Sequence, residues 1–345
     1  MTAADRTASP DGTGSGPLTI AQIAERAGVS VATVSKVVNG RADVSRATRS
    51  TVENVIRQHG YRRRKKAASP AALLELVFQT LSGVYANAVL QGVQTVARQH
   101  RLATVVSELR GQAPGYSWVE EVLARRPTGV ISVFTGPTDE EGHQLRSRGI
   151  PFVIIDPTGE PGHESPSVGA GNWSGGLSAT RHLLQLGHRR IGYLAGPAGR
   201  TTTRHRLEGH REALTAAGLA GDAERLTVQG AYDRAAGYDG ALELLRREPG
   251  LTAIMAANDT VALGVCAALR DRGLRIPEDV SVTGFDDLPF AVDAMPALTT
   301  VRLPLHDAAA RAGRLVLGRE NPPPGGVTTF PTELMVRQST AVPRR

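Results

Sequence analysis

The sequence predicts an all-α helix-turn-helix headpiece followed by an α/β core of two lobes with parallel sheets. Two short helical patterns lie within residues 19–40, separated by a tight Gly-Val-Ser turn. From Leu73 onward, short β-rich runs alternate with stretches of helical periodicity, which is typical of parallel sheets made of βαβ units. Positive charge is concentrated near the N-terminus and balanced elsewhere, which indicates a small nucleic-acid-binding domain ahead of a larger core.

The first two helices of the headpiece have apolar faces that can cover each other. Apolar residues recur three and four positions apart, at Ile20, Ile23, Ala24 and Ala27 in the first helix and at Val34, Val37 and Val38 in the second. Gly28 supplies the turn between them, because a positive φ costs little only for glycine. Ser30 is the expected N-cap of the second helix.

A third helix is expected to begin after Ser45 and to end at Gly60-Tyr61, with Val52, Val55 and Ile56 facing the first pair. The headpiece then spans residues 18–61. Residues 1–17, which are polar and rich in Gly, Ser, Thr and Pro, are expected to form a disordered tail. Residues 62–72 form a basic linker, or hinge, that contains Pro70.

The net charge of +7 arises in the headpiece and linker. Residues 18–66 contain eleven Lys or Arg and three acidic residues, whereas the 279 residues that follow balance at 28 against 28. A local surplus of this kind indicates a surface that binds a polyanion. The exposed face of the second helix would meet base edges in a major groove; its residues are Val31, Ala32, Ser35 and Lys36. The alternative is an exposed helical hairpin without a partner.

The core is expected over residues 73–340, with a short tail at 341–345. One lobe takes about 73–170 and 303–322, and the other takes about 171–300 and 325–340. Strands are expected at 76–78, 104–106, 130–133, 152–155, 190–194, 226–228, 252–256 and 280–283. A helix over 305–317 and a strand near 328–334 are expected to cross back between the lobes. Ligands of open α/β sheets bind at the carboxyl ends of strands, so the cleft between the lobes is the expected site.

Composition narrows the class of protein further. The single cysteine, Cys266, permits no internal disulfide, fits a reducing compartment and is expected to pack as a small hydrophobe. No secretory signal and no apolar run long enough to span a bilayer is evident, so we expect a cytoplasmic protein without a membrane partner. The core lacks a G-x-G-x-x-G motif, a phosphate loop and a Cys/His cluster, which disfavours an enzyme and predicts no catalytic residues, no metal and no cofactor. A sugar-binding protein without DNA activity is the other alternative, which the basic headpiece disfavours.

Several stretches together carry a family resemblance. They are TIAQIAERAGVSVATVSKVVNG at 19–40, HLLQLGHRRIGYLAGP at 182–197, RLEGHREAL at 206–214, AANDTVALG at 256–264 and RIPEDVSVTGFDDLP at 275–289. With these motifs in this order, the chain resembles the lactose-repressor (LacI) family of bacterial transcription regulators from about residue 18 to residue 340. The resemblance implies a periplasmic-binding-protein-like core, a homodimer on a near-palindromic double-stranded operator, and a small effector that alters operator affinity.

By position in that family, Val31 and Ala32 are the base-reading residues, with Lys36 one turn on. Two small apolar side chains cannot form bidentate hydrogen bonds to a purine, so they favour apolar contacts such as thymine methyls, and Lys36 is the expected polar reader. The positions that match phosphate contacts are Ser30, Thr33, Ser35 and Asn39. For Thr33, a plain helix-surface hydroxyl is the alternative.

The linker departs from the family pattern. Relatives carry a short hinge helix with a leucine that enters the minor groove, and here the spacing is shorter and the leucine is missing. Pro70 also disfavours a regular helix. We therefore expect the basic run to attract phosphates; it consists of Arg62, Arg63, Arg64, Lys65 and Lys66.

The effector site is expected at four positions that match family ligand contacts: Asp156, Arg206, Asn258 and Asp286. Tyr232 and Trp173 offer flat faces for a sugar ring, with ordinary packing as the alternative for each. Asp259 and Asp287 are expected to be structural, either as a helix cap or as a brace for the turn.

This set of donors and acceptors favours a carbohydrate effector over a purine or a sugar phosphate. Arg206, with Arg200 and Arg204 nearby, leaves a purine or a sugar phosphate as the alternative. Effector binding is expected to close the cleft and change the spacing of the two headpieces in a dimer, as inducer or as corepressor. No leucine heptads follow the last strand, which favours a dimer over a tetramer.

Overall fold

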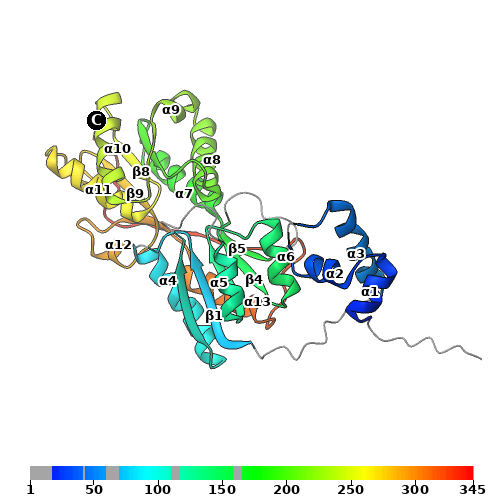
Figure 1. The fold of residues 1–345 in the computed structure, drawn as a ribbon. Coiled ribbons are helices and arrows are strands. Elements are labelled where there is room, and N and C mark those ends of the chain that lie inside the picture. The colour runs from blue at the N-terminus through cyan, green and yellow to red at the C-terminus, as the bar shows by residue number, and fades with distance from the viewer. Residues whose placement is uncertain are drawn as a thin grey trace, which may run out of the picture. The chain divides into compact units, whose positions relative to one another are not determined.

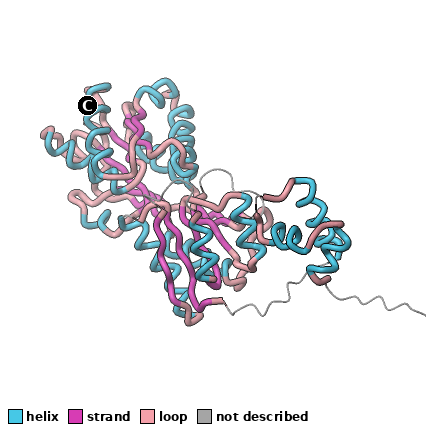
Figure 2. The backbone as a smooth tube through the Cα atoms, in the orientation of Figure 1, coloured by secondary structure: helices cyan, strands magenta, loops and turns pink. Residues whose placement is uncertain are grey.

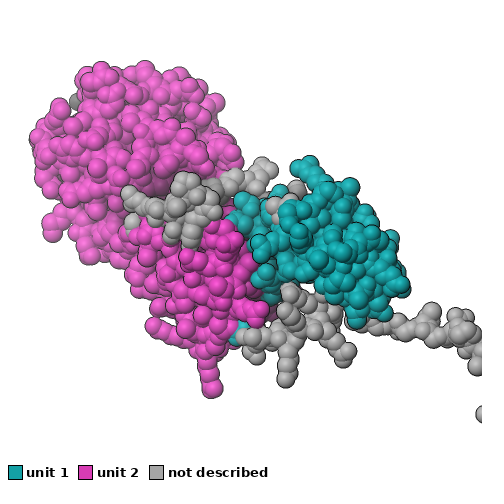
Figure 3. Space-filling model, viewed as in Figure 1, with its two compact units in different colours: residues 1–70, 138–149 teal, residues 71–137, 150–345 magenta. Residues whose placement is uncertain are grey.

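The computed structural model describes residues 18–41, 43–59, 70–81, 83–109, 117–157 and 165–344. The chain forms two compact units, residues 1–70 with 138–149 and residues 71–137 with 150–345, drawn in two colours in Figure 3. The expected N-terminal tail, the end of the third helix at Gly60-Tyr61 and the basic run at 62–66 lie outside the described residues.

The headpiece consists of three helices, α1 (Ile20–Ala27), α2 (Val31–Val38) and α3 (Arg46–His59). Thr19 caps α1 through a capping box with Gln22. The chain then turns at Gly28, whose φ is 63°. Ser30 caps α2 by accepting the Thr33 N–H at 3.1 Å, so the prediction for both residues of the turn is confirmed.

The headpiece has its own small core. Its fully covered members come from all three helices: Ile23, Ala24, Val34, Val37 and Val52. Val55 and Ile56 pack against them as expected. Each helix is too short to be stable alone in water, so this shared apolar face holds the headpiece together.

The N-lobe is a six-stranded sheet in the order β11-β5-β4-β3-β1-β2, whose pairings are all parallel. The strands from the first half of the chain are β1 (Ala71–Phe78), β2 (Ala103–Glu108), β3 (Pro127–Val133), β4 (Phe152–Ile155) and β5 (Ser167–Ala170). The helices that connect them are α4 (Gly83–Gln99), α5 (Trp118–Arg125) and α6 (Asp139–Ser147). Residues 138–149, which contain α6, are grouped with the first unit.

Helix α13 (Leu305–Val316) returns from the far end of the chain and packs on α4. Glycines allow this close approach: a Cβ on Gly92 would lie 2.3 Å from the His306 carbonyl oxygen. The apolar residues of α13 join those of β1, β3 and β4 in one core, as expected for residues 303–322.

The C-lobe is a second six-stranded sheet, in the order β12-β10-β9-β8-β6-β7. Its strands are β6 (Ile191–Ala195), β7 (Thr227–Gln229), β8 (Ala253–Ala256), β9 (Ser281–Asp286) and β10 (Thr299–Arg302), with β12 described below. Its helices are α7 (Asn172–Gln185), α8 (Thr201–Ala216), α9 (Ala220–Arg225), α10 (Arg234–Arg247), α11 (Asp259–Asp271) and α12 (Phe290–Asp293). Figures 1 and 2 show the strands of both lobes enclosed by helices.

The last strand differs from the prediction. Residues 325–340 were assigned to the C-lobe with one strand near 328–334, but the chain forms two strands, β11 (Val327–Phe330) and β12 (Glu333–Met335). β11 pairs in parallel with β5 and belongs to the N-lobe, whereas β12 pairs antiparallel with β10. Pro331 separates them, since proline has no N–H for a sheet ladder. The prediction was therefore wrong for residues 327–330, and β5 and β10 were missed.

Cys266 lies partly buried against the apolar core of the C-lobe, as expected for a small hydrophobe. In the described part of the chain, no helix combines the length and the apolar character needed to cross a membrane.

Candidate nucleic-acid interface and effector site

The exposed face of α2 carries the residues that the sequence predicts as base readers. Val31 is 48% exposed, and Ala32 and Lys36 are also exposed, while Val34 and Val37 on the opposite face are buried. Val31 is not among the residues of the apolar core of the headpiece. The helix therefore presents two small apolar groups and one cation on the same surface.

The polar residues around this face are partly engaged within the helix. The hydroxyls of Ser30 and Thr33 lie 2.8 Å apart. Asn39 donates to the carbonyl oxygen of Ser35 at 2.6 Å and so closes the last turn of α2. These hydrogen bonds give the residues a structural role in α2, and their contacts with phosphate stay a prediction.

Lys36 forms an ion pair that the sequence analysis missed. Its Nζ lies 2.7 Å from Asp43 Oδ2, and the two side chains are about half exposed. The hydrogen bond from Lys36 holds the pKa of Asp43 below its usual value. Side chains on one helix meet when they are three or four residues apart. Asp43 lies seven residues after Lys36 and beyond the end of α2, so the spacing in the sequence did not predict this ion pair.

In the core, a cavity of about 360 Å³ lies between the two lobes. The N-lobe contributes Asp156, Pro157, Ser167, Gly169, Ala170, Val327 and Thr329, and the C-lobe side contributes Gly171, Asn172, Trp173, Ser174, Thr201, Thr202, Arg204 and His205. Of the six predicted effector residues, Asp156 and Trp173 line this cavity. Trp173 is 41% exposed, so its ring is available as a flat apolar surface.

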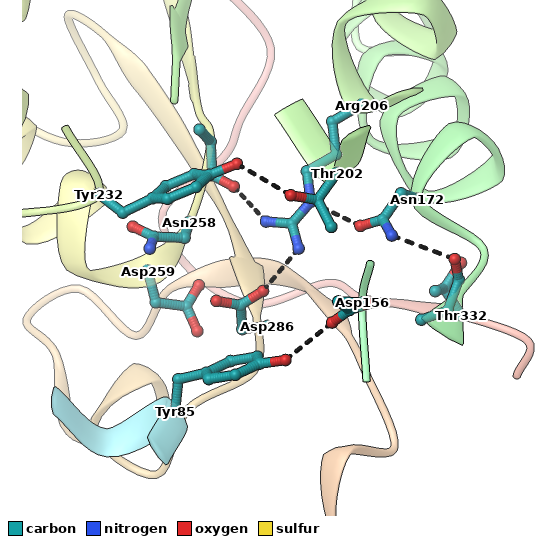
Figure 4. A network of polar contacts seen from close by, with 12 residues as sticks. Tyr85, Asp156, Asn172, Thr202, Arg206, Tyr232, Asn258, Asp259, Asp286 and Thr332 are labelled. Atoms are coloured by element: carbon teal, nitrogen blue, oxygen red, sulfur yellow. Dashed lines mark hydrogen bonds and ion pairs between the residues drawn. The ribbon is translucent and has the colours of Figure 1, made fainter. Parts of the chain in front are cut away.

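Arg206 and Asp286 lie in a buried polar network (Figure 4). Arg206 donates to Asn172 Oδ1 at 2.8 Å, to the Ala257 carbonyl oxygen at 2.6 Å and to Asp286 Oδ1 at 3.1 Å. Its guanidinium also stacks on the ring of Phe285 at 3.8 Å. All three nitrogens of this buried cation therefore have hydrogen-bond partners, and the network holds Asn172 at the start of α7.

The carboxylates of the site are perturbed by burial. Burial raises the pKa of Asp286 to about 6, against the opposing effect of Arg206. Burial likewise raises the pKa of Asp156, whose Oδ2 accepts a hydrogen bond from the Tyr85 hydroxyl at 2.7 Å. Tyr85 was missed, although it follows β1 at the carboxyl end of the sheet, where ligand-site residues are expected.

Both carboxylates also lie on strained backbone. Asp156 has a φ of 47° and Asp286 a φ of 105°, and neither is a glycine. Asp156 directly follows β4 and Asp286 is the last residue of β9, and both strands are buried. The position of each strand therefore determines where the chain has to turn. Strain of this kind accumulates where a structure must hold a side chain in one place, which is typical of ligand sites.

Tyr232 and Asn258 lie near the network but do not line the cavity described above (Figure 4). The Tyr232 ring packs on Gly196, where a Cβ would come within 2.2 Å of it, and its hydroxyl is 2.6 Å from that of Thr203. Much of the environment of Tyr232 is therefore ordinary packing, which was the alternative to a sugar contact. Asn258 caps α11 by accepting the Val261 N–H at 2.8 Å.

The roles expected of the two neighbouring acids are partly corrected. Asp259 does not cap the following helix. It is the first residue of α11, and Asn258 is the N-cap. Instead, Asp259 is buried and accepts hydrogen bonds from the Leu288 N–H at 2.7 Å and the Thr300 hydroxyl at 2.5 Å. Asp287 braces the turn through ion pairs with Arg302 and Arg337, as expected.

Comparison with known proteins identifies the architecture. The pattern of bacterial regulatory proteins of the lacI family matches residues 19–64, and the periplasmic-binding-protein-like domain matches residues 180–340. The transcriptional regulator GalS of Salmonella typhimurium is 36% identical over 305 residues, which cover 87% of this chain and 89% of GalS. The chain belongs to the LacI family.

Two solved structures of transcriptional regulators each resemble more than nine tenths of the chain. The complex of the regulator CelR with cellobiose has a TM-score of 0.70 and 31% sequence identity, and covers 93% of this chain and 99% of CelR. The lac repressor dimer bound to operator and an anti-inducer has a TM-score of 0.64 and 27% identity, over 94% of this chain and 100% of that one. This LacI-family protein is accordingly a helix-turn-helix transcriptional regulator with a DNA-binding headpiece.

Proposed function

We propose that this regulator represses transcription from an operator to which its affinity is changed by a small carbohydrate bound between the lobes. The observation that carries the proposal is the cavity that combines Asp156, Asn172 and the Thr201 and Thr202 hydroxyls with the open face of Trp173. Hydrogen-bond acceptors and donors around an apolar ring face match the hydroxyls and the ring of a sugar.

Buried polar groups support this choice of ligand class. Asp156 and Asp286 are held by Tyr85 and Arg206, so neither is free to move when a ligand enters. Preorganised groups lose little entropy on binding. The related regulator CelR, in its complex with cellobiose, supports a carbohydrate as effector. Four further residues are proposed to contact the effector when the cleft closes: Arg206, Tyr232, Asn258 and Asp286.

On the DNA side, we propose that a homodimer places α2 of each headpiece in a major groove. Val31 and Ala32 then make apolar base contacts, Lys36 reads a polar edge, and Ser30, Thr33, Ser35 and Asn39 contact phosphate. The basic run at 62–66 adds phosphate attraction. The protein acts by binding without catalysis, and we place it in the cytoplasm with the DNA it regulates.

The test is a footprint of the purified full-length protein on DNA flanking its own gene, repeated with a panel of mono- and oligosaccharides. We expect protection of a near-palindromic site and a change in its apparent Kd with one sugar. By linkage, operator DNA must change the affinity for that sugar by the same factor. A sugar that binds equally well with and without operator contradicts the allosteric part of the proposal, and the absence of any specific site contradicts the whole.

A further inference from the structure

Two long helices begin at the wall of the interlobe cavity. The first turn of α7 contributes Asn172, Trp173 and Ser174, and the first turn of α8 contributes Thr201 and Thr202. Neither helix has an acidic residue in its first turn, and neither of their N-cap residues makes a side-chain capping hydrogen bond. The N-terminal partial positive charges of both helices thus meet at one cavity without a protein anion nearby in either first turn.

Two basic side chains extend this positive wall. Arg204 and His205, the fourth and fifth residues of α8, also line the cavity. Arg204 is exposed, and among the described residues it forms a loose ion pair with Glu208 of the same helix at 3.8 Å. An arginine in this setting can turn toward an anion at little cost, because an exposed pair of this kind stabilises the protein only weakly.

A buried hydroxyl on the opposite wall points to a missing partner. Ser167 in β5 lines the cavity and is 1% exposed, yet its Oγ has no hydrogen-bond partner in the structure described here. Buried hydroxyls are almost always hydrogen-bonded in folded proteins. A ligand atom that accepts from Ser167 would satisfy it.

Among the described residues that line the cavity, Asp156 is the one carboxylate, and it already has a hydrogen-bond partner. Asp156 accepts the Tyr85 hydroxyl, and its burial raises its pKa, which weakens its repulsion of an anion. It remains available as an acceptor for a neutral ligand hydroxyl. The cavity thus has a polar side at Asp156 and a positive side at the starts of α7 and α8.

We propose that the effector of this regulator is an acidic sugar, whose carboxylate or phosphate binds where α7 and α8 begin. Arg204, His205 and the first-turn N–H groups donate to the oxyanion, and the sugar hydroxyls face Asp156 and Ser167. The inference rests on the proposed function, because it assigns a ligand class to the effector cavity. A volume of about 360 Å³ lies within the range typical of small-molecule pockets.

The first experiment titrates the full-length protein with inorganic phosphate, gluconate and glucose 6-phosphate, each against neutral glucose. The chain has two tryptophans, and Trp173 lines the cavity while Trp118 lies buried in α5, so Trp118→Phe leaves Trp173 as the fluorescent reporter. We expect at least one acidic sugar to change Trp173 emission with an apparent Kd about tenfold or more below that of glucose. The same compound should change operator affinity.

A pair of variants separates anion binding from folding. Ser174→Asp adds a carboxylate to the first turn of α7, where it favours the helix but repels a bound anion, and Ser174→Asn is its neutral match. We expect Ser174→Asp to weaken binding of the acidic sugar about tenfold or more with an unchanged or higher Tm, and Ser174→Asn to leave it near wild type. Arg204→Gln should weaken it severalfold. Arg246→Gln should not, because Arg246 is an exposed arginine that pairs with Glu243 on its own helix and does not line the cavity.

Each outcome decides the inference. An acidic sugar that binds better than its neutral parent and loses affinity in Ser174→Asp supports it, with gluconate and glucose 6-phosphate distinguishing carboxylate from phosphate. Binding of inorganic phosphate without preference for the acidic sugars means an adventitious ion only and overturns it. Neutral sugars that bind equally well and release the operator overturn the inference and leave the proposed function intact, while operator binding that responds to no sugar overturns the proposed function itself.

Discussion

At α2, the polar side chains are exposed or partly exposed, and they contact residues three to seven positions away, as Ser30 does with Thr33 and Lys36 with Asp43. In the core, Arg206 is buried and contacts residues 34, 51 and 80 positions away. The first arrangement leaves its groups hydrated and free to exchange partners for phosphates and bases. The second fixes its groups in one geometry, at the cost of removing charges from water. The comparison indicates that the headpiece adapts to its ligand, whereas the core selects a ligand that fits it.

The largest expected effect comes from breaking the buried network. Arg206→Met removes the cation that compensates Asp286, and a buried carboxylate left unpaired destabilises a protein by about 3 kcal/mol or more. Urea unfolding at neutral pH should show this loss. Arg206→Met with Asp286→Asn should recover much of it, and Arg246→Met on an exposed helix face should leave stability unchanged. Equal effects of the buried and exposed substitutions would contradict the contrast between the two regions.

A pH dependence follows from Asp259, whose burial raises its pKa to about 8. Since the unfolded carboxyl has a pKa near 4, the folded state holds this proton more tightly, and stability decreases as the pH rises through about 8. Between pH 7 and pH 9 the decrease from this group amounts to about 1 kcal/mol. Urea unfolding across that range measures it.

Asp259→Asn is the matched variant for this pH dependence, because an amide resembles the protonated acid. We expect its stability to vary less between pH 7 and pH 9 than that of the wild type. An unchanged slope in the variant would assign the pH dependence to another group.

Features that depend on neighbouring residues could be predicted from the sequence. Gly28 and Ser30 could be predicted because a turn and a cap depend on neighbours within a few positions. The cap of α11 was assigned to Asp259, whereas Asn258 caps the helix, since a shift of one residue in the helix start decides which side chain is the cap.

The partners of Arg206 and the pairing of β11 with β5 depend on chain segments far apart in sequence. No local pattern encodes such contacts. The family resemblance predicts Arg206 and Asp286 as effector contacts, but it did not specify that they would form a buried ion pair with each other.

A smaller effect is expected from the cap of α2. Ser30→Ala removes the acceptor for the Thr33 N–H and should destabilise the headpiece by about 0.5 to 1 kcal/mol. Hydrogen exchange of the α2 amides in the full-length protein should be faster, and exchange in the C-lobe should be unchanged. Slower exchange in α2, or faster exchange in both regions, would contradict a local role.

Ser30→Asp keeps a capping oxygen and serves as the control. It should restore the slow exchange of α2 while weakening DNA binding, because it places a carboxylate beside the proposed phosphate contacts. The two readouts thereby separate the structural role of Ser30 from its proposed role in DNA binding.

The smallest expected effect concerns the ion pair of Lys36 with Asp43 on the headpiece surface. Asp43 competes with DNA for the Lys36 ammonium, so Asp43→Asn should leave folding unchanged and increase affinity for non-specific duplex about two- to fivefold at low salt. Fluorescence anisotropy with labelled duplex at several salt concentrations measures both the affinity and its salt dependence, and the gain should shrink as salt rises. Lys36→Met should lower operator affinity. In the Lys36→Met background, Asp43→Asn should change DNA affinity very little, because no Lys36 ammonium remains that Asp43 could hold away from the DNA. If Asp43→Asn increases affinity equally with and without Lys36, the acid acts by general repulsion of the phosphates, and the headpiece would not exchange this internal partner for DNA.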